Sequence, residues 1–145
     1  PHAMEFPRAK VGGSDYDFSF SGMKSAVLNY INQAEMKGET ICVPDLAASF
    51  QNAVVDVLVS RTVAAAKEYG YEKLAIAGGV ASNSALRAGM EKACRESGIQ
   101  LYYPSPVFCT DNAAMIGAAA YYEYINGARA GWDLNAVANL KLGER

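Results

Sequence analysis

Between residues 73 and 126, short apolar segments alternate with segments of helical period, and this pattern limits the fold more than any other. Lys73–Ala77 has the composition of a strand and ends in paired glycines, and residues 83–97 follow as a helix. Gln100–Tyr103 is a second strand, stopped by prolines, and residues 110–126 form a helix that ends before a glycine. Strand, helix, strand and helix with short joints predict an α/β unit whose strands run parallel.

Two longer helices are predicted before this unit. Apolar residues at helical spacing indicate one helix over residues 21–37, with Gly38 as its stop, and another over residues 44–69. Polar and aromatic residues alternate over 15–20, which predicts a short strand, and residues 1–15 are expected to be an irregular lead-in. The two helical stripes are Met23, Ala26, Val27, Tyr30, Ile31 and Ala34, and then Leu46, Phe50, Ala53, Val54, Val57, Leu58, Arg61 and Ala65.

Composition sets bounds on location and partners. The 145 residues have a net charge of −2, with 13 basic and 15 acidic side chains and no basic cluster. A protein that binds RNA through phosphates by itself normally has a basic face, so other surfaces would do much of the binding. Three cysteines without a CxxC pair argue against a disulfide framework and for a cytoplasmic location. No apolar run reaches the roughly 20 residues that span a bilayer, so no membrane association is expected.

The loop from Gly78 to Asn83 is the first candidate site. It follows a strand and precedes a helix, the position where open α/β sheets bind ligands. Paired glycines, Gly78 and Gly79, allow close approach of a ligand to the backbone, and the next helix start favours an anion. The loop is neither a GxGxxG motif nor a P-loop. A tight turn in which Ser82 or Asn83 caps the helix explains the same residues equally well.

The second and third candidates also lie where helices are predicted to begin. Asp111 offers a carboxylate for a metal or a nucleotide hydroxyl, although helix capping by Thr110 or Asp111 is the commoner use of such residues. One carboxylate is not a metal site, and the sole histidine, His2, lies in the lead-in. Ser21 and Lys24 could contact a phosphate, but a capped helix with a solvated lysine is favoured. Most of the nine tyrosines are expected in the core or at its rim.

Five segments, in order along the chain, carry a family resemblance. Phe6–Arg8 resembles an FPR or LPR element, and Asp17–Val27 resembles a DFSFSGLK(T/S)AV signature. Asp45–Gln51 is similar to DLSASFQ, Ala77–Arg87 to AGGVAANxxLR, and Cys109–Ile116 to CTDNAAMI. Together these motifs resemble those of the TsaD family, the tRNA adenosine threonylcarbamoyltransferases.

The resemblance implies a fold and a reaction. It implies an actin/Hsp70-like ATPase (ASKHA) fold, of which residues 1–145 would be the carboxy-terminal lobe only. The family transfers threonylcarbamoyl from threonylcarbamoyl-AMP to N6 of the adenosine beside the anticodon. Its site holds one divalent metal, usually iron, through an HxxxH motif and an aspartate. By motif match Asp111 is that aspartate and Asn83 contacts the adenylate, ATP or threonylcarbamoyl-AMP, with Gly78 and Gly79 lining the same cleft.

The resemblance also implies partners and a departure from the family pattern. The HxxxH motif is absent from this chain, so we expect the chain alone to be inactive, with the histidines supplied by an amino-terminal lobe. Bacterial members work with TsaB-like and TsaE-like proteins and act on tRNA. Two other readings remain open. One is a metal-dependent O-sialoglycoprotein endopeptidase, an older label of relatives, and the other is a non-catalytic module that docks partners through the stripe of Met23, Val27 and Tyr30.

Overall fold

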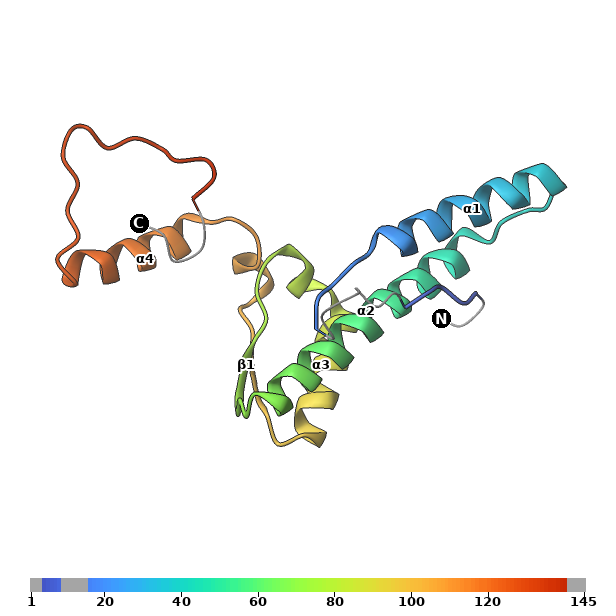
Figure 1. Cartoon of the computed structure of the whole chain (residues 1–145), viewed down its shortest axis with the longest axis horizontal. Helices are drawn as coiled ribbons and strands as arrows, with labels where there is room; N and C mark the ends of the chain where they lie inside the picture. Colours follow the sequence, from blue (N-terminus) through green and yellow to red (C-terminus); the bar gives the residue numbers. More distant parts are fainter. Residues whose placement is uncertain (1–3, 9–15, 141–145) are drawn as a thin grey trace. The chain divides into compact units, whose positions relative to one another are not determined.

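The computed structural model describes residues 4–8 and 16–140, which divide into two compact units, and the boundary along the chain lies between Thr110 and Asp111. The first unit contains α1 (Ser21–Lys37), α2 (Val43–Glu68), β1 (Lys73–Ala75), the 3-10 turn η1 (Gly79–Ser82), α3 (Ser84–Glu96), β2 (Gln100–Tyr102) and the 3-10 turn η2 (Pro106–Phe108). The second unit contains α4 (Ala113–Ile125). Figure 1 labels the main elements along the chain.

The helices begin and end where local chemistry directs. Pro44 occupies the first turn of α2, where its missing N–H is not needed, and Asp45 stands in the same turn. Gly38 ends α1 in the left-handed region at φ 69°, and the amide of Glu39 donates to the carbonyl of Ala34 over 2.9 Å. The predicted bounds of α1, α2 and α3 are therefore confirmed to within about two residues.

Within residues 4–8 and 16–140, the sheet has two strands. β1 pairs with β2 in parallel, with Leu74 opposite Leu101, and α3 makes the connection between them. The parallel α/β unit predicted from the sequence is confirmed, although each strand is shorter than predicted. The strand predicted at residues 15–20 is wrong: 16–20 form neither helix nor strand, and residue 15 lies outside the described residues.

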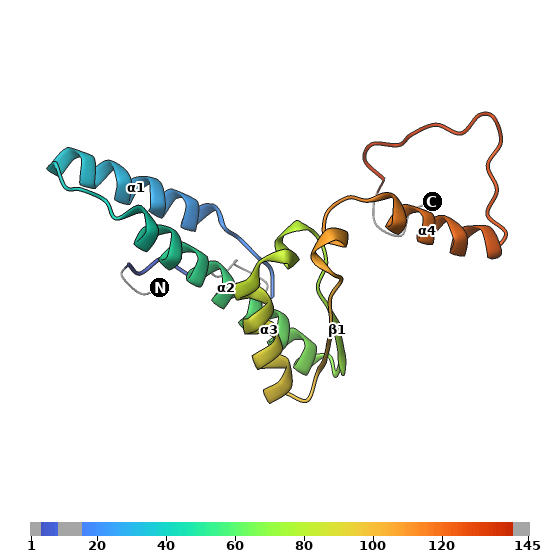
Figure 2. The ribbon, with the colours of Figure 1, turned by 180° about the vertical axis from the view of Figure 1, so that it is seen from behind.

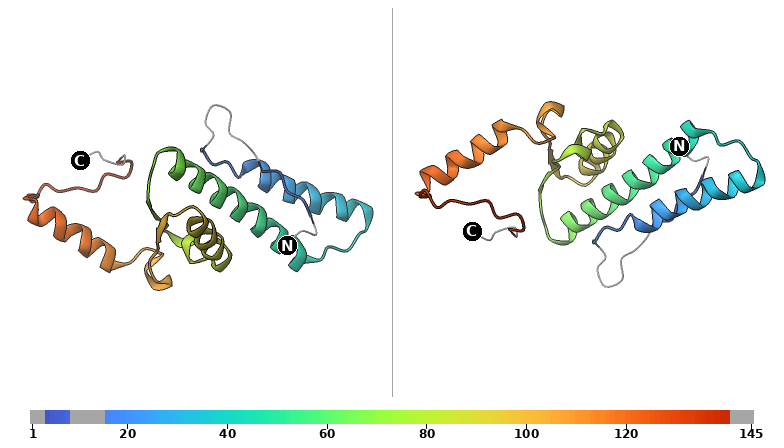
Figure 3. Two further views of the ribbon diagram at one scale, coloured as in Figure 1. Left: turned by 90° about the horizontal axis from the view of Figure 1, so that it is seen from below. Right: turned by 90° about the horizontal axis from the view of Figure 1, so that it is seen from above.

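One apolar cluster joins α1 to the first half of α2. Met23 of α1 is 1% exposed, and Leu46, Ala53 and Val57 of α2 are buried against it. Figures 1 and 2 show α1 and α2 side by side from opposite directions, and Figure 3 shows the same pairing from below and above. The stripe of Met23, Val27 and Tyr30 is thus mainly core: Met23 is buried, Val27 packs against the cluster and only Tyr30 is exposed.

Residues 4–8 are irregular, as predicted, but they pack against α2. Phe6 is buried and meets Phe50 edge-on, with ring centroids 6.1 Å apart. The amide of Met4 donates to the hydroxyl of buried Ser49, and Arg8 forms an ion pair with Asp56. The FPR element therefore anchors the lead-in to α2, a role that the residues alone did not predict.

A second apolar cluster joins the end of α2 to α3 and the sheet. Its buried members are Val63, Ala66, Leu86, Met90, Cys94 and Ile99, and Leu74 and Leu101 of the strands pack against it. Gly89 of α3 faces α2 so closely that an added Cβ would lie 3.1 Å from Val59 and 3.3 Å from Val55. The absence of a side chain at position 89 sets the distance between the two helices.

The tyrosines and α4 depart from expectation. None of the nine tyrosines is buried, so the expectation that tyrosines lie in the core is wrong, while a place at its rim stays a prediction. No residue of α4 is buried either. In the second unit Asn112, and not Thr110 or Asp111, caps α4, because its side chain accepts from the amide of Met115 at 3.0 Å.

We predict that Gly89→Leu destabilises the protein by about 1–3 kcal/mol, because the larger side chain overpacks the contact with Val55 and Val59. The measurement is the Tm, which should fall by several degrees. Gly22→Leu is the matched control, since a Cβ at Gly22 of α1 would meet nothing within 4 Å. Equal Tm values for the two variants would show that α2 and α3 can separate without cost.

Candidate functional site

The loop from Gly78 to Asn83 joins β1 to α3 and contains the turn η1. Gly78 has φ 85° and ψ 170°, a conformation that residues with a side chain rarely adopt. The amide of Ala81 donates to the carbonyl of Gly78 at 2.9 Å, and the hydroxyl of Ser82 donates to that of Gly79 at 2.6 Å. Gly78 and Gly79 are both exposed, so the backbone at this strand end is open to a ligand.

Gly79, unlike Gly78, does not have a positive φ that would require a glycine. An added Cβ at Gly79 would meet Thr110 at 3.8 Å, an ordinary contact distance. The positive φ therefore explains the glycine at position 78, whereas neither backbone strain nor packing explains the one at position 79. The same distance places Thr110, which precedes Asp111 in sequence, beside this loop.

Asn83 is both a helix cap and a link to α2. Its side-chain oxygen accepts from the amide of Leu86 at 3.0 Å, so Asn83, not Ser82, is the N-cap of α3. Its side-chain nitrogen donates to the amide oxygen of Gln51 at 3.0 Å. The capping interpretation of this loop is thus confirmed for Asn83. Capping leaves a ligand-contacting role untested, since an amide offers further lone pairs and a second N–H.

A recess of about 230 Å³ lies beside this asparagine. Phe50 and Gln51 of α2 line one part of it, and Val80 and Asn83 of the loop line another. The structure thus brings Asp45–Gln51, which resembles DLSASFQ, against the Gly78–Asn83 loop. Sequence reasoning treated these two motifs separately, because nothing local in either one indicates that the third turn of α2 faces the end of η1.

Asp111 is the first residue of the second unit, and its carboxylate is exposed. It does not cap α4, since Asn112 does. The idea that Asp111 and the Gly78–Asn83 loop face one crevice stays a prediction. Within residues 4–8 and 16–140, no group of three or more His, Cys, Asp or Glu side chains could hold a metal ion, and His2 lies outside these ranges. The described residues therefore do not form a metal site by themselves.

The third candidate is only partly as expected. Ser21 and Lys24 are exposed in the first turn of α1, which agrees with a solvated lysine. Phe20 stands at the N-cap and no side chain caps the helix there, so the expected capped helix start is wrong. Of the cysteines, Cys42 is exposed and Cys109 is buried, and burial raises the pKa of the Cys94 thiol.

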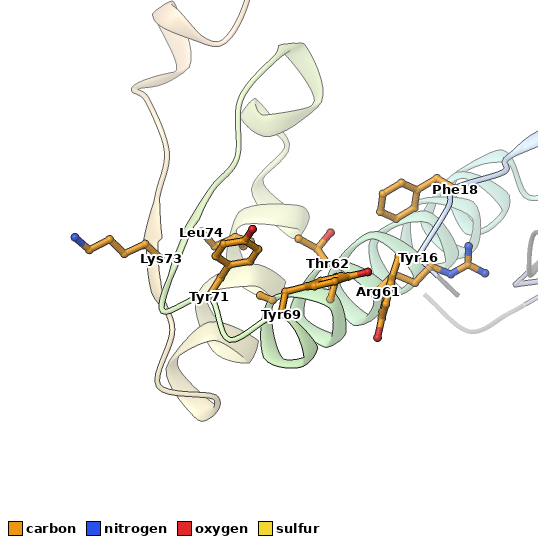
Figure 4. Close-up of a pocket in the computed structure, with 10 residues that line it drawn as sticks. Tyr16, Phe18, Arg61, Thr62, Tyr69, Tyr71, Lys73 and Leu74 are labelled. Carbon is orange, nitrogen blue, oxygen red and sulfur yellow. The ribbon is translucent and has the colours of Figure 1, made fainter. Parts of the chain in front are cut away.

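A further pocket, of about 260 Å³, lies at the other end of α2 (Figure 4). Its aromatic residues are Tyr16, Phe18, Tyr69 and Tyr71. The ring centroids of Tyr16 and Tyr69 are 6.1 Å apart, and those of Tyr69 and Tyr71 are 6.5 Å apart. Arg61 also lines it, and its guanidinium donates to the carbonyl of Asp17. None of the residues predicted for the site lines this pocket. Sequence spacing did not reveal the aromatic group, because its members come from different segments.

Within the described residues, no helix has the length and apolarity needed to cross a membrane.

We predict that Asn83→Ala lowers stability by about 1 kcal/mol, because the amide of Leu86 loses its acceptor. Asn83→Asp should be nearly neutral by the same measure, since aspartate also caps helices. Chemical denaturation of the two variants in parallel tests this. Equal destabilisation by both substitutions would mean that the bond to Gln51, and not the cap, is the stabilising contact.

Comparisons with known proteins agree on one family. The model of the TsaD family, described as tRNA N6-adenosine threonylcarbamoyltransferase, matches residues 2–118. The protein of that name from Clostridium botulinum strain Hall is 58% identical to this chain, and the one from Clostridioides difficile strain 630 is 54% identical. Each alignment covers 99% of this chain. The one from Clostridium novyi strain NT is 56% identical over 145 residues. The chain spans 42% of the length of each of these relatives. By sequence and motif order alike, this chain belongs to the TsaD family.

Proposed function

We propose that the full-length protein forms threonylcarbamoyladenosine in tRNA, and that this chain is the carboxy-terminal lobe of its ASKHA fold. The donor is threonylcarbamoyl-AMP, and the acceptor is N6 of the adenosine beside the anticodon. The family match supports the reaction, since the relatives are named for it. The observation that carries the site is the contact of Asn83 with Gln51 beside the Gly78–Asn83 loop, which joins two family motifs at one strand end.

In this proposal the loop binds the adenylate. The exposed backbone at Gly78 and Gly79 allows a ligand to approach closely. Gly79 supports this, because neither strain nor packing in the first unit requires a glycine there. The start of α3 follows at once, and the partial positive charge of a helix N-terminus favours a phosphate. Asn83 binds the side-chain amide of Gln51 at the edge of the recess, where both side chains can contact the nucleoside.

Asp111 is proposed as one ligand of a divalent metal, iron by family resemblance. The described residues contain no group of three or more possible ligands, so the other ligands would come from the remainder of the protein. The metal would supply Lewis-acid chemistry when bound. The freedom of Asp111 from helix capping supports the assignment, because the carboxylate has no structural duty in α4.

The partners in this proposal are TsaB-like and TsaE-like proteins, with tRNA bound by the full assembly in the cytoplasm. A net charge of −2 without a basic cluster supports tRNA binding through surfaces beyond this chain. No observation on the described residues favours an endopeptidase. The docking-module alternative loses its main feature, since Met23 is 1% exposed and belongs to the core.

The test is formation of threonylcarbamoyladenosine from unmodified tRNA and threonylcarbamoyl-AMP, measured by mass spectrometry of digested nucleosides. We expect product from the full-length protein with its two partners and none from residues 1–145 alone. Gly79→Ala in the full-length protein should keep the Tm, because its Cβ has room, and lower kcat/KM for the adenylate. Absence of product from the full-length assembly would refute the function, and a fully active Gly79→Ala variant would refute the placement of the ligand.

We predict that Asp111→Ala lowers the metal content of the purified full-length protein well below that of wild type, while far-UV circular dichroism stays unchanged. The fold should persist because Asn112 caps α4 without help from Asp111. Asp133→Ala, which removes another exposed carboxylate of the second unit, is the control. Elemental analysis decides: equal metal content in the two variants would remove Asp111 from the ligand set.

A further inference from the structure

Arg87 of α3 binds two loops at once. Its Nε donates to the carbonyl of Ala81 at 2.6 Å, inside the turn η1. One Nη donates to the carbonyl of Pro104 at 2.8 Å and lies 3.2 Å from the sulfur of Cys109. These two partners bracket the segment that leads from β2 to Asp111. The side chain therefore ties the Gly78–Asn83 loop to the Pro104–Cys109 segment.

The surroundings hold this guanidinium in place. It lies 4.6 Å from the centroid of the Tyr103 ring, on whose face a cation is attracted. The hydroxyl of Tyr103 donates to the carboxylate of Glu91, one turn along α3, and this hydrogen bond raises the pKa of Tyr103. Ala81 and Cys109 are only 2% and 3% exposed, so the bridge reaches into the protein.

The chemistry of this bridge requires arginine. A planar guanidinium presents several N–H groups in a fixed fork, which here reach carbonyls from two different loops. A lysine has one ammonium on a flexible stem and cannot hold both carbonyls in that geometry. Loss of the fork would remove these side-chain hydrogen bonds between the two loops.

We propose that Arg87 is a positioning residue, which fixes the Gly78–Asn83 loop relative to the Pro104–Cys109 segment and thereby sets the geometry of the adenylate site. This inference rests on the proposed function for its kinetic consequence, and on the structure alone for the loop bridge. Arg87 touches no substrate in this proposal. It acts through the backbone of Ala81 and through Cys109, two residues before Asp111.

The structural arm of the test is hydrogen exchange, measured by mass spectrometry on full-length Arg87→Lys. We expect exchange on the order of tenfold faster at the amides of Ala81 and Asn83 in the first loop. The amides of Phe108 and Cys109 should show the same change, and the interior of α2 should show none. Arg95→Lys is the matched control, because Arg95 is exposed on the same helix.

The kinetic arm uses the threonylcarbamoyl-AMP assay. We expect kcat/KM of Arg87→Lys to fall by roughly tenfold to a hundredfold, with a higher KM for the adenylate, because small misplacement of binding groups is costly. A purely structural role would lower only the amount of active enzyme, so the apparent kcat would fall at unchanged KM. Arg95→Lys should match wild type in both constants.

Each outcome decides the proposal. Unchanged exchange at both loops overturns it, and so does faster exchange throughout α2 and α3, which would indicate a general loss of structure. If Arg87→Lys does not fold, Tyr103→Leu removes the ring beside the guanidinium and the hydroxyl that binds Glu91, and unchanged loop exchange in that variant also overturns the proposal. If wild type makes no threonylcarbamoyladenosine, the proposed function fails while the exchange experiment still tests the bridge.

Discussion

The packing of α2 is the interaction on which the first unit depends. This helix of 26 residues buries its first half against α1 and its second half against α3 and the sheet. Different faces of α2 contact these two clusters, so its apolar residues occupy more than one stripe. The lead-in adds a third partner through Phe6. Burial of this apolar surface, rather than helix propensity, holds the elements together.

The candidate site follows from that packing. The distance between α3 and α2, set by Gly89, places the start of α3 against the middle of α2. Asn83 can therefore cap its own helix and reach Gln51 of α2 with the same side chain. Arg87, one turn further along α3, bridges the loops at the ends of both strands. A packed helix pair thus supports two loops, an arrangement suited to ligand binding.

Element by element, local patterns predicted the helices well but were wrong about a strand before α1 and about the cap of α4. The bounds of α1 were right because Gly38 and the apolar period act within one turn. The strand over residues 15–20 was wrong because alternation alone cannot supply a hydrogen-bonded neighbour. The cap of α4 was placed one or two residues early, since Thr110, Asp111 and Asn112 are all good capping residues and only the backbone geometry distinguishes them.

The sequence by itself determined the helices, the parallel strand pair and membership of the TsaD family, because periodicity, stop signals and motif order are local properties of the chain. Only the tertiary structure decided that Asn83 contacts Gln51, that Phe6 is buried on α2 and that Arg87 joins two loops. These contacts link residues that are distant in sequence. They arise from how helices and strands pack, and no local pattern records that packing.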